Sequence, residues 1–260
     1  MDDENVLDFS FWPSFADLML ALVLILVLVL FLIIAVISVG TLNLSHVQRK
    51  QTEMAAEIAA SFGGEPKELK KEENGTSVYG ISISSEGTYD LIVRNEPTLQ
   101  RITFSDHVLF KQDDHALNPG GERVLKIAGA ALKNRLASIR EIQIQGHADP
   151  DATKHFPSNV HLAALRAIEV YKFLQDSAGI DPARHLMSAT SFGEFKPVQR
   201  EDDAVYDRDK LRKHNETPRL KGRNRRIELL LFYRVNEEIH PSSLESRCWP
   251  ASLAQTRLRA

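Results

Sequence analysis

EIQIQGHAD, residues 141–149, begins with alternating apolar and polar side chains, the pattern of a short β-strand. HLMSATSFG, residues 185–193, is a second stretch with the character of a strand. Between them lies a helical pattern, whose apolar residues are Val160, Ala164, Ala167, Ile168, Tyr171 and Leu174. The order strand, helix, strand predicts a βαβ unit with a right-handed crossover.

Further patterns surround this unit. Residues 121–136 have apolar side chains at helical spacing, and SVYGISISSEGTYDLIVRN alternates on both sides of SSEG. The latter predicts a β-hairpin from about Val78 to Arg94. RRIELLLFY, residues 225–233, has apolar residues on both faces, as a strand buried in a sheet does. The predicted fold class of the C-terminal part is therefore α/β, with helices packed on a mixed sheet.

An apolar segment precedes this domain. Residues 18–37 are twenty consecutive apolar residues, the length that an α-helix needs to cross a hydrocarbon core. A cleavable signal peptide would instead have a basic start, a shorter apolar core and a small-residue cleavage site. The start MDDENVLDF has four acids and no Lys or Arg. We therefore predict a permanent transmembrane helix at residues 15–40, after a short tail at residues 1–14.

The segment between this helix and the domain has two parts. Residues 45–62 have the composition of a helix that continues or follows the membrane helix, with apolar residues at helical spacing. GGEPKELKKEENG, residues 63–75, is charged, is broken by Gly and Pro, and has no apolar face, which predicts a linker. We assign residues 41–75 to helix and linker, residues 76–235 to the domain with its hairpin, and residues 236–260 to a C-terminal tail.

The amino-acid composition excludes few classes of protein. The net charge of -3 does not favour direct binding to nucleic acid, and the single cysteine, Cys248, excludes an intramolecular disulfide. The loop at residues 194–222 mixes charges of both signs, so we expect it to be solvated surface without a chemical role.

Two patterns imitate enzyme sites. DPDAT, residues 149–153, has the D-x-D-x-T spacing of haloacid dehalogenase-like phosphatases, but GHA separates its first Asp from the apolar strand. His147, His155 and His161 fit no compact zinc-ligand spacing. We therefore expect no enzyme activity, no catalytic residue, no metal and no cofactor.

Three segments together resemble a known family. They are GHAD at residues 146–149, N-x-x-L-A-x-L-R-A at residues 159–167 and N-R-R-I-E at residues 224–228. In this order and context they resemble the peptidoglycan-binding domain shared by the OmpA C-terminal region and MotB, over roughly residues 102–232. GHAD stands where the family usually has GHTD, and Ala163 where it generally has Ser. The resemblance implies an OmpA-like domain that binds the diaminopimelate part of the cell-wall stem peptide.

The free end of this ligand carries an ammonium and a carboxylate. By position, Asp149 and Arg166 match the pair that the family uses to bind it, with Asn159, Leu162 and Arg226 as supporting contacts. A guanidinium can hold a carboxylate through two parallel hydrogen bonds. The alternative is that Asp149 pairs with Arg166, or Arg166 with Glu169, simply to stabilise the fold.

Asp17 stands at the start of the apolar run and has two interpretations. Ser14-x-x-Asp17 is a capping-box-like pattern, so Asp17 can be a helix cap. An ionisable group near the membrane is also costly, and is often part of an ion pathway. A short tail, a membrane helix starting with W-x-x-x-A-D and a wall-binding domain resemble MotB-type stator subunits. By position, Asp17 is the residue that carries the permeating proton or sodium ion in that family.

The resemblance also implies partners and a location. It implies a homodimer, fixed to peptidoglycan, whose membrane helices lie inside a pentamer of a multi-span MotA-like or ZorA-like protein. Residues 47–62 are then expected to pack as a helical pair in the dimer and to help close the channel. Wall binding places the C-terminal domain in the periplasm and the N-terminus in the cytoplasm, with one span of the inner membrane. Arg49 and Lys50, just after the helix, oppose this orientation by the positive-inside rule.

The segment WPSFADLM looks closer to ZorB, the stator-like subunit of Zorya anti-phage defence systems, than to flagellar MotB, whose N-terminus is typically basic. The alternatives are a flagellar stator subunit and a passive tether between the membrane and peptidoglycan.

Overall fold

The computed structural model describes residues 11–83, 89–200 and 205–235. The chain divides into two compact units between Ser45 and His46. The predicted C-terminal tail, the first ten residues and the SSEG tip of the predicted hairpin lie outside the described residues.

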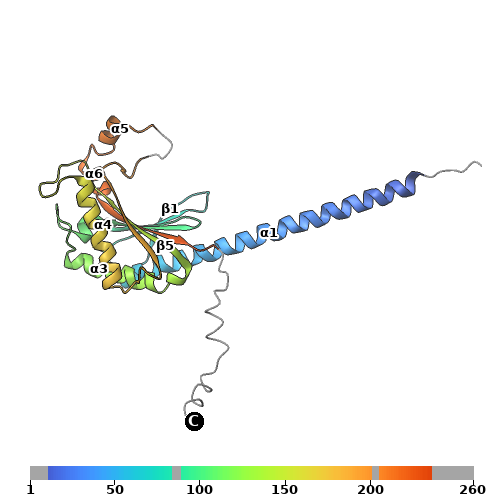
Figure 1. Cartoon of the computed structure of the whole chain (residues 1–260), viewed down its shortest axis with the longest axis horizontal. Helices are drawn as coiled ribbons and strands as arrows, with labels where there is room; N and C mark the ends of the chain where they lie inside the picture. Colours follow the sequence, from blue (N-terminus) through green and yellow to red (C-terminus); the bar gives the residue numbers. More distant parts are fainter. Residues whose placement is uncertain (1–10, 84–88, 201–204, 236–260) are drawn as a thin grey trace, which may run out of the picture. The chain divides into compact units, whose positions relative to one another are not determined.

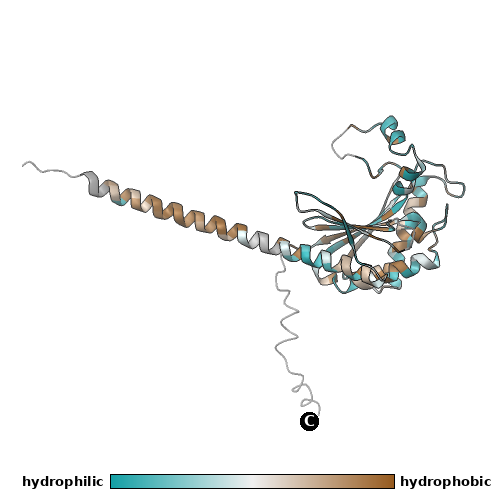
Figure 2. Cartoon of the chain, turned by 180° about the vertical axis from the view of Figure 1, so that it is seen from behind, coloured by the Kyte–Doolittle hydropathy of each residue, from teal (hydrophilic) through white to brown (hydrophobic). Residues whose placement is uncertain are grey.

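Helix α1, Phe11–Ser61, provides all the described residues of the first unit (Figure 1). Its segment Phe15–Ser38 has a mean hydropathy of 3.8 and is long and apolar enough to cross a membrane. Figure 2 shows this segment of the helix almost entirely in the brown of hydrophobic residues. A helix suits such a segment because it satisfies its backbone hydrogen bonds internally, which lipid cannot do. The predicted N-terminal apolar helix is thus confirmed.

The last turns of α1, residues 46–61, belong to the second unit. Met54 and Ile58 are fully buried in its core, and the side chain of buried Gln51 donates to the Glu96 carbonyl oxygen at 3.0 Å. Gln100 in turn donates to the carbonyl oxygen of Gln51 at 2.8 Å. The prediction that this helix continues the membrane helix is confirmed. The apolar face of this segment is buried in the domain core, and the expected pairing of residues 47–62 between two copies stays a prediction.

The second unit contains a seven-stranded sheet in the order β1-β2-β3-β4-β7-β5-β6. Strands β5 and β6 are parallel and the other neighbours are antiparallel, so the predicted mixed sheet is confirmed. Strand β7 lies between β4 and β5, which explains why its sequence is apolar on both faces. The strands are β1 (Lys67–Lys71), β2 (Ser77–Ile81), β3 (Leu91–Asn95), β4 (Leu99–Ser105), β5 (Ile139–His147), β6 (Leu186–Gly193) and β7 (Arg226–Tyr233).

Helices pack against this sheet and connect its strands. The predicted βαβ unit is β5-α4-β6, and the predicted hairpin is β2-β3, in which Val78 is paired with Arg94. The helix α4 begins after Ser158, whose side chain accepts from the backbone N–H of His161 and so caps the helix. The helices of the second unit after α1 are α2 (Asp106–Leu109), α3 (Pro119–Lys133), the 3-10 helix η1 (Leu136–Ser138), α4 (Asn159–Asp176), α5 (Arg208–Lys213) and α6 (Pro218–Asn224).

Helix α4 lies unusually close to β5 at one point. A Cβ atom added to Gly146 would lie 2.0 Å from the carbonyl oxygen of Ala163, so only glycine permits this approach. The contact fixes the N-terminal half of α4 against the end of β5. Residues that follow β5 and residues on α4 are therefore held next to each other.

Part of the predicted linker is a strand. Residues 67–71 form β1, which pairs antiparallel with β2, although all five side chains are exposed. Because β1 is an edge strand with solvent at both faces, no apolar alternation marks it in the sequence. The interpretation of residues 63–75 as a linker is therefore corrected. The charged loop at residues 194–222 likewise contains the helix α5 and most of α6, neither of which was predicted.

We predict that Ile58→Ala lowers the free energy of unfolding of the second unit by roughly 2–4 kcal/mol, because it leaves a cavity in the core. The measurement is urea unfolding of a fragment that begins at His46. Glu53→Gln, on the exposed face of the same helix, is the matched control and should change stability by less than about 0.5 kcal/mol. Equal effects of the two changes would show that residues 46–61 are not part of the core.

Candidate functional site

A pocket of about 400 Å³ lies where the three family-like segments meet. GHAD completes β5, the second segment begins α4, and the third leads into β7, which neighbours β5 in the sheet. Four of the five predicted wall-binding residues line this pocket, and α2 contributes Asp106. The lining residues are Asp106, Gln112, Asp113, Ala148, Asp149, Asp151, Ala152, Thr153, Lys154, His155, Asn159, Leu162, Arg166 and Arg225.

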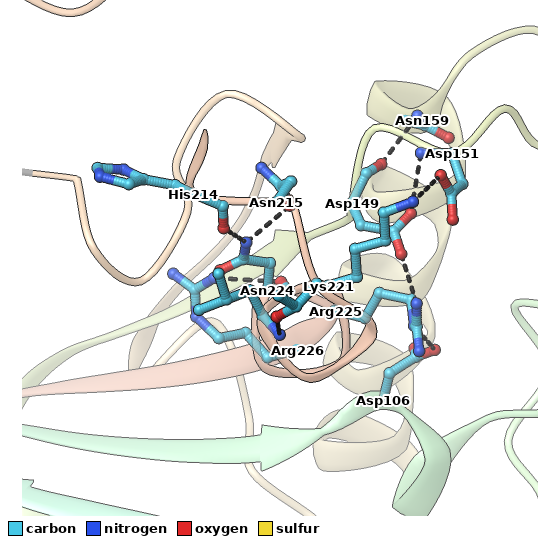
Figure 3. Close-up of polar contacts among 12 residues, drawn as sticks. Asp106, Asp149, Asp151, Asn159, His214, Asn215, Lys221, Asn224, Arg225 and Arg226 are labelled. Carbon is cyan, nitrogen blue, oxygen red and sulfur yellow. Dashed lines mark hydrogen bonds and ion pairs between the residues drawn. The ribbon is translucent and has the colours of Figure 1, made fainter. Parts of the chain in front are cut away.

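Asp149 is held in place from several sides. Its carboxylate accepts from the backbone N–H of Asp151 at 3.1 Å and forms an ion pair with the guanidinium of Arg225. The side-chain amide of Asn159 donates to the backbone carbonyl of Asp149 at 3.0 Å. Figure 3 shows these contacts around the end of β5. Asn159 therefore orients the backbone that presents the Asp149 carboxylate.

Arg166 is only 2% exposed and forms the buried wall of the pocket. Its Nη1 lies 2.9 Å from Oδ1 of Asp106, and its Nε donates to the carbonyl oxygen of Asp114 at 2.7 Å. Its guanidinium carbon lies 5.1 Å from the centre of the Phe110 ring. The carboxylate partner of Arg166 is thus Asp106, which is neither of the two partners that the sequence left open.

Four charges of alternating sign follow one another through the pocket: Arg166, Asp106, Arg225 and Asp149. Arg225 connects the two carboxylates, with its Nε 4.0 Å from Asp106 Oδ2. Burial raises the pKa of Asp106, although Arg166 and Arg225 oppose this effect. Burial likewise lowers the pKa of Arg166, against the attraction of Asp106. A site of this kind offers both a carboxylate and a guanidinium to a zwitterionic ligand.

The structure does not bring Arg226 to the pocket. Its guanidinium is buried beside β7, where Nε lies 2.6 Å from Glu228 Oε1 and Nη2 donates to the carbonyl oxygen of Lys196 at 3.2 Å. Arg225, the preceding residue, occupies the place expected for Arg226. Successive side chains of an extended chain point in opposite directions, so only one of two adjacent arginines can face the pocket. The motif N-R-R contains both, and the sequence alone did not distinguish them.

The loop between Asp149 and Asn159 is bound to the side chain of Asp113. This carboxylate accepts from the Thr153 hydroxyl at 2.5 Å and from the backbone N–H of Lys154 at 2.9 Å, and it lies 2.9 Å from the Nδ1 of His155. Asp113 itself has a φ angle of +53°, a conformation that non-glycine residues rarely adopt. These contacts, which the sequence did not predict, shape one side of the pocket.

The three histidines considered as zinc ligands have separate surroundings. His155 pairs with Asp113, His161 stacks on Phe156, and His147 stacks on Phe192. Across residues 11–83, 89–200 and 205–235 there is no group of three or more His, Cys, Asp or Glu residues arranged to hold a metal ion.

His147 and Glu228 form a buried titratable pair next to Arg226. The Nε2 of His147 lies 3.7 Å from Glu228 Oε2, and Arg101 also contacts this carboxylate. Burial, together with Arg226, lowers the pKa of His147 to about 3. Burial alone would raise the pKa of Glu228, but Arg226, His147 and Arg101 outweigh it and hold that pKa at about 2. The folded domain therefore favours neutral His147 and ionised Glu228.

We predict that acid destabilises the domain through His147 before it affects Glu228. In the unfolded chain, His147 takes up a proton near pH 6.5 and Glu228 near pH 4.5. In the folded chain, both groups take up a proton only at lower pH. Between pH 6.5 and 4.5 the free energy of unfolding should fall by about 2–3 kcal/mol from His147 alone. Urea unfolding at these two pH values checks this. His147→Leu should remove most of that loss, and an unchanged loss would contradict the prediction.

Comparisons with known proteins agree with this architecture. Residues 109–210 match the model of the OmpA family. A MotB-like protein from Desulfovibrio vulgaris is 24% identical, with a TM-score of 0.51 over 74% of this chain and 99% of that chain. The cell wall anchor of the T6SS from Pseudomonas aeruginosa is 24% identical, with a TM-score of 0.44 over 56% of this chain and 89% of that one.

The periplasmic domain of Helicobacter pylori MotB is 20% identical, with a TM-score of 0.48 over 68% of this chain and 99% of that chain. No curated protein matches the chain. The family match and the similarity to the Desulfovibrio vulgaris structure show that the C-terminal domain has the predicted OmpA-like fold.

Proposed function

We propose that this chain anchors a membrane-embedded motor to the cell wall, and that its pocket binds the diaminopimelate end of peptidoglycan stem peptides. The observation that carries the proposal is the row of alternating charges from Arg166 to Asp149 within an OmpA-like domain. The ammonium of the ligand would pair with Asp149. Its carboxylate would be held by the guanidinium groups of Arg166 and Arg225.

The other predicted residues have supporting roles in this proposal. Asn159 fixes the backbone of Asp149, and Leu162 lines the pocket beside it. Arg226 would act from a distance, because its buried contacts hold the start of β7 and thus the position of Arg225. This binding role requires no catalytic residue and no cofactor.

We predict that Asp149→Asn weakens binding of a soluble tripeptide ending in diaminopimelate by at least about tenfold, since it removes the partner of the ligand ammonium. Isothermal titration of the purified domain measures this. Asp176→Asn is the matched control, because it removes the same charge from an exposed residue at the end of α4, outside the pocket. It should retain nearly wild-type affinity. If Asp149→Asn binds as tightly as the wild type with an unchanged fold, the pocket is not the wall-binding site.

Wall binding would also set the orientation of the chain. Peptidoglycan lies outside the inner membrane, so the C-terminal domain would be periplasmic, the helix α1 would span the inner membrane once, and residues 1–14 would be cytoplasmic. The candidate span Phe15–Ser38 supports a single crossing. The positive charges of Arg49 and Lys50 oppose this orientation only moderately, since large domains can be translocated despite such charges.

Asp17 supports a motor rather than a plain tether. It is the one Asp, Glu, Lys or Arg residue in the candidate span Phe15–Ser38. A tether needs no acid in its membrane helix, and an acid there is costly. In our proposal, Asp17 accepts and releases the permeating proton or sodium ion. Two copies of the chain would stand inside a pentamer of a MotA-like or ZorA-like multi-span protein, without direct contact to nucleic acid.

The motor we propose is of the Zorya type, in which the chain has the role of ZorB, and the WPSFADLM segment is the feature that supports this. The similarity to a MotB-like protein is equally compatible with a flagellar stator subunit. The two differ in what the motor serves, namely defence against phage or rotation of a flagellum.

We predict that Asp17→Asn abolishes protection against phage in cells that carry the native gene neighbourhood, because Asn preserves size and polarity but cannot ionise. Phage plating efficiency at equal protein level measures this, with Asp17→Glu as the control that keeps a carboxylate. Protection by Asp17→Asn would show that the motor does not need an ionisable group at this position, which lies inside α1 and therefore does not cap it. If the wild type gives no protection, the defence role is wrong, and a motility motor or a tether takes its place.

A further inference from the structure

A strongly basic segment leads into the pocket. We call residues 205–225, which include α5 and α6, the basic lobe. The lobe has eight Arg or Lys residues and three acidic residues, in a chain whose net charge is -3. If Arg200 and the acids Glu201, Asp202 and Asp203, which precede the lobe, are counted with it, the excess of positive charge remains. Figure 2 shows the short helices of this region as hydrophilic.

Several of these cations form no ion pair within the part of the chain that the structure describes. Arg208, Lys213, Arg219 and Arg223 are exposed, and no carboxylate of the described residues forms an ion pair with them. Cations gathered on one surface repel each other, which disfavours the folded lobe unless an anion screens them. The lobe thus has the charge and the exposure of a surface that binds a polyanion.

The lobe is nevertheless held in a defined conformation. Asn215 and Asn224 are buried, and the amide of Asn224 donates to the Asn215 side chain at 2.7 Å and to the carbonyl oxygen of His214 at 3.0 Å. The Asn224 side-chain oxygen accepts from the backbone N–H of Val198 at 2.9 Å. Because this buried network orders α5 and α6 without an apolar core, the cations are presented by a fixed scaffold.

The lobe is continuous with the pocket. Lys221 of α6 reaches the pocket loop, with its Nζ 2.5 Å from Asp151 Oδ1, and Arg225 directly follows α6 and lines the pocket. Figure 3 shows Lys221 and Arg225 side by side next to Asp149. The basic lobe is therefore within reach of a polymer that has one end group in the pocket.

We propose that the basic lobe is a second wall-binding surface, which holds the free carboxylates of stem peptides adjacent to the one in the pocket. This proposal rests on the proposed function, because it takes peptidoglycan as the polymer. Peptidoglycan fits the lobe since its uncrosslinked stem peptides carry carboxylates repeated along each strand. Contacts of this kind are solvent-exposed, so they act through charge and weaken as salt rises.

The test uses the full chain in discs of neutral lipid. The lobe variant combines Arg208→Gln, Lys213→Gln, Arg219→Gln and Arg223→Gln. Its matched control removes the same charge from exposed lysines outside the lobe, by Lys67→Gln, Lys71→Gln, Lys126→Gln and Lys172→Gln. Each protein is titrated with purified sacculi at low and high salt, with the soluble diaminopimelate tripeptide, and with duplex DNA.

At low salt, the lobe variant should bind sacculi at least about tenfold more weakly than the wild type and the control, and high salt should remove most of the difference. Its affinity for the tripeptide should stay within about twofold, since the pocket is intact. Equal binding to sacculi by the lobe variant and the wild type at low salt would overturn the proposal. A loss confined to DNA binding would also overturn it, and would assign the lobe to nucleic acid.

The two proposals fail in different ways. If the wild type binds sacculi through the lobe but does not bind the tripeptide, the pocket assignment is wrong and the lobe assignment stands. If Asp149→Asn removes tripeptide binding while the lobe variant keeps full affinity for sacculi, the pocket stands and the lobe proposal is wrong.

Discussion

The buried ion pair between Arg166 and Asp106 is the contact on which the rest of the site depends. It joins the middle of α4 to the first residue of α2, and neither charge can remain buried without the other. Removing one partner of such a pair typically costs about 3–5 kcal/mol. Burial nevertheless raises the pKa of Asp106 despite two nearby arginines, because removing this carboxylate from water opposes its ionisation. Such a costly arrangement is typical of binding sites.

From this pair, the geometry of the pocket follows. Asp106 lies close to Arg225, and Arg225 pairs with Asp149 beyond the end of β5. The close approach of α4 to Gly146 holds the two sides of the pocket together. The four charges come from widely separated parts of the chain, and the sheet order β4-β7-β5 is what brings them to one place. The basic lobe extends the same charge pattern along the surface through Lys221.

Helix α1 combines two sequence patterns in one element. Residues 15–38 are apolar on all sides except at Asp17, which is the pattern of a membrane-spanning helix. Residues 46–61 have one apolar face, which the sheet domain buries, and a polar face with the exposed pair Arg49 and Glu53. The helix passes from the membrane pattern to the amphipathic pattern without an intervening loop. The apolar face of the second part therefore belongs to the domain core.

Local patterns in the sequence were enough to predict the apolar helix, the β5-α4-β6 unit and the β2-β3 hairpin, whereas Asp149, Asn159, Leu162 and Arg166 were assigned to one site by the resemblance of short motifs to a known family. These features follow from side-chain periodicity and from short motifs, which are properties of adjacent residues. Tertiary structure alone showed that Asp106 is the partner of Arg166, that Arg225 and not Arg226 faces the pocket, and that residues 67–71 are a strand. Each of these depends on pairing between distant segments, because an ion pair, a strand register and an edge strand exist only once another part of the chain lies beside them.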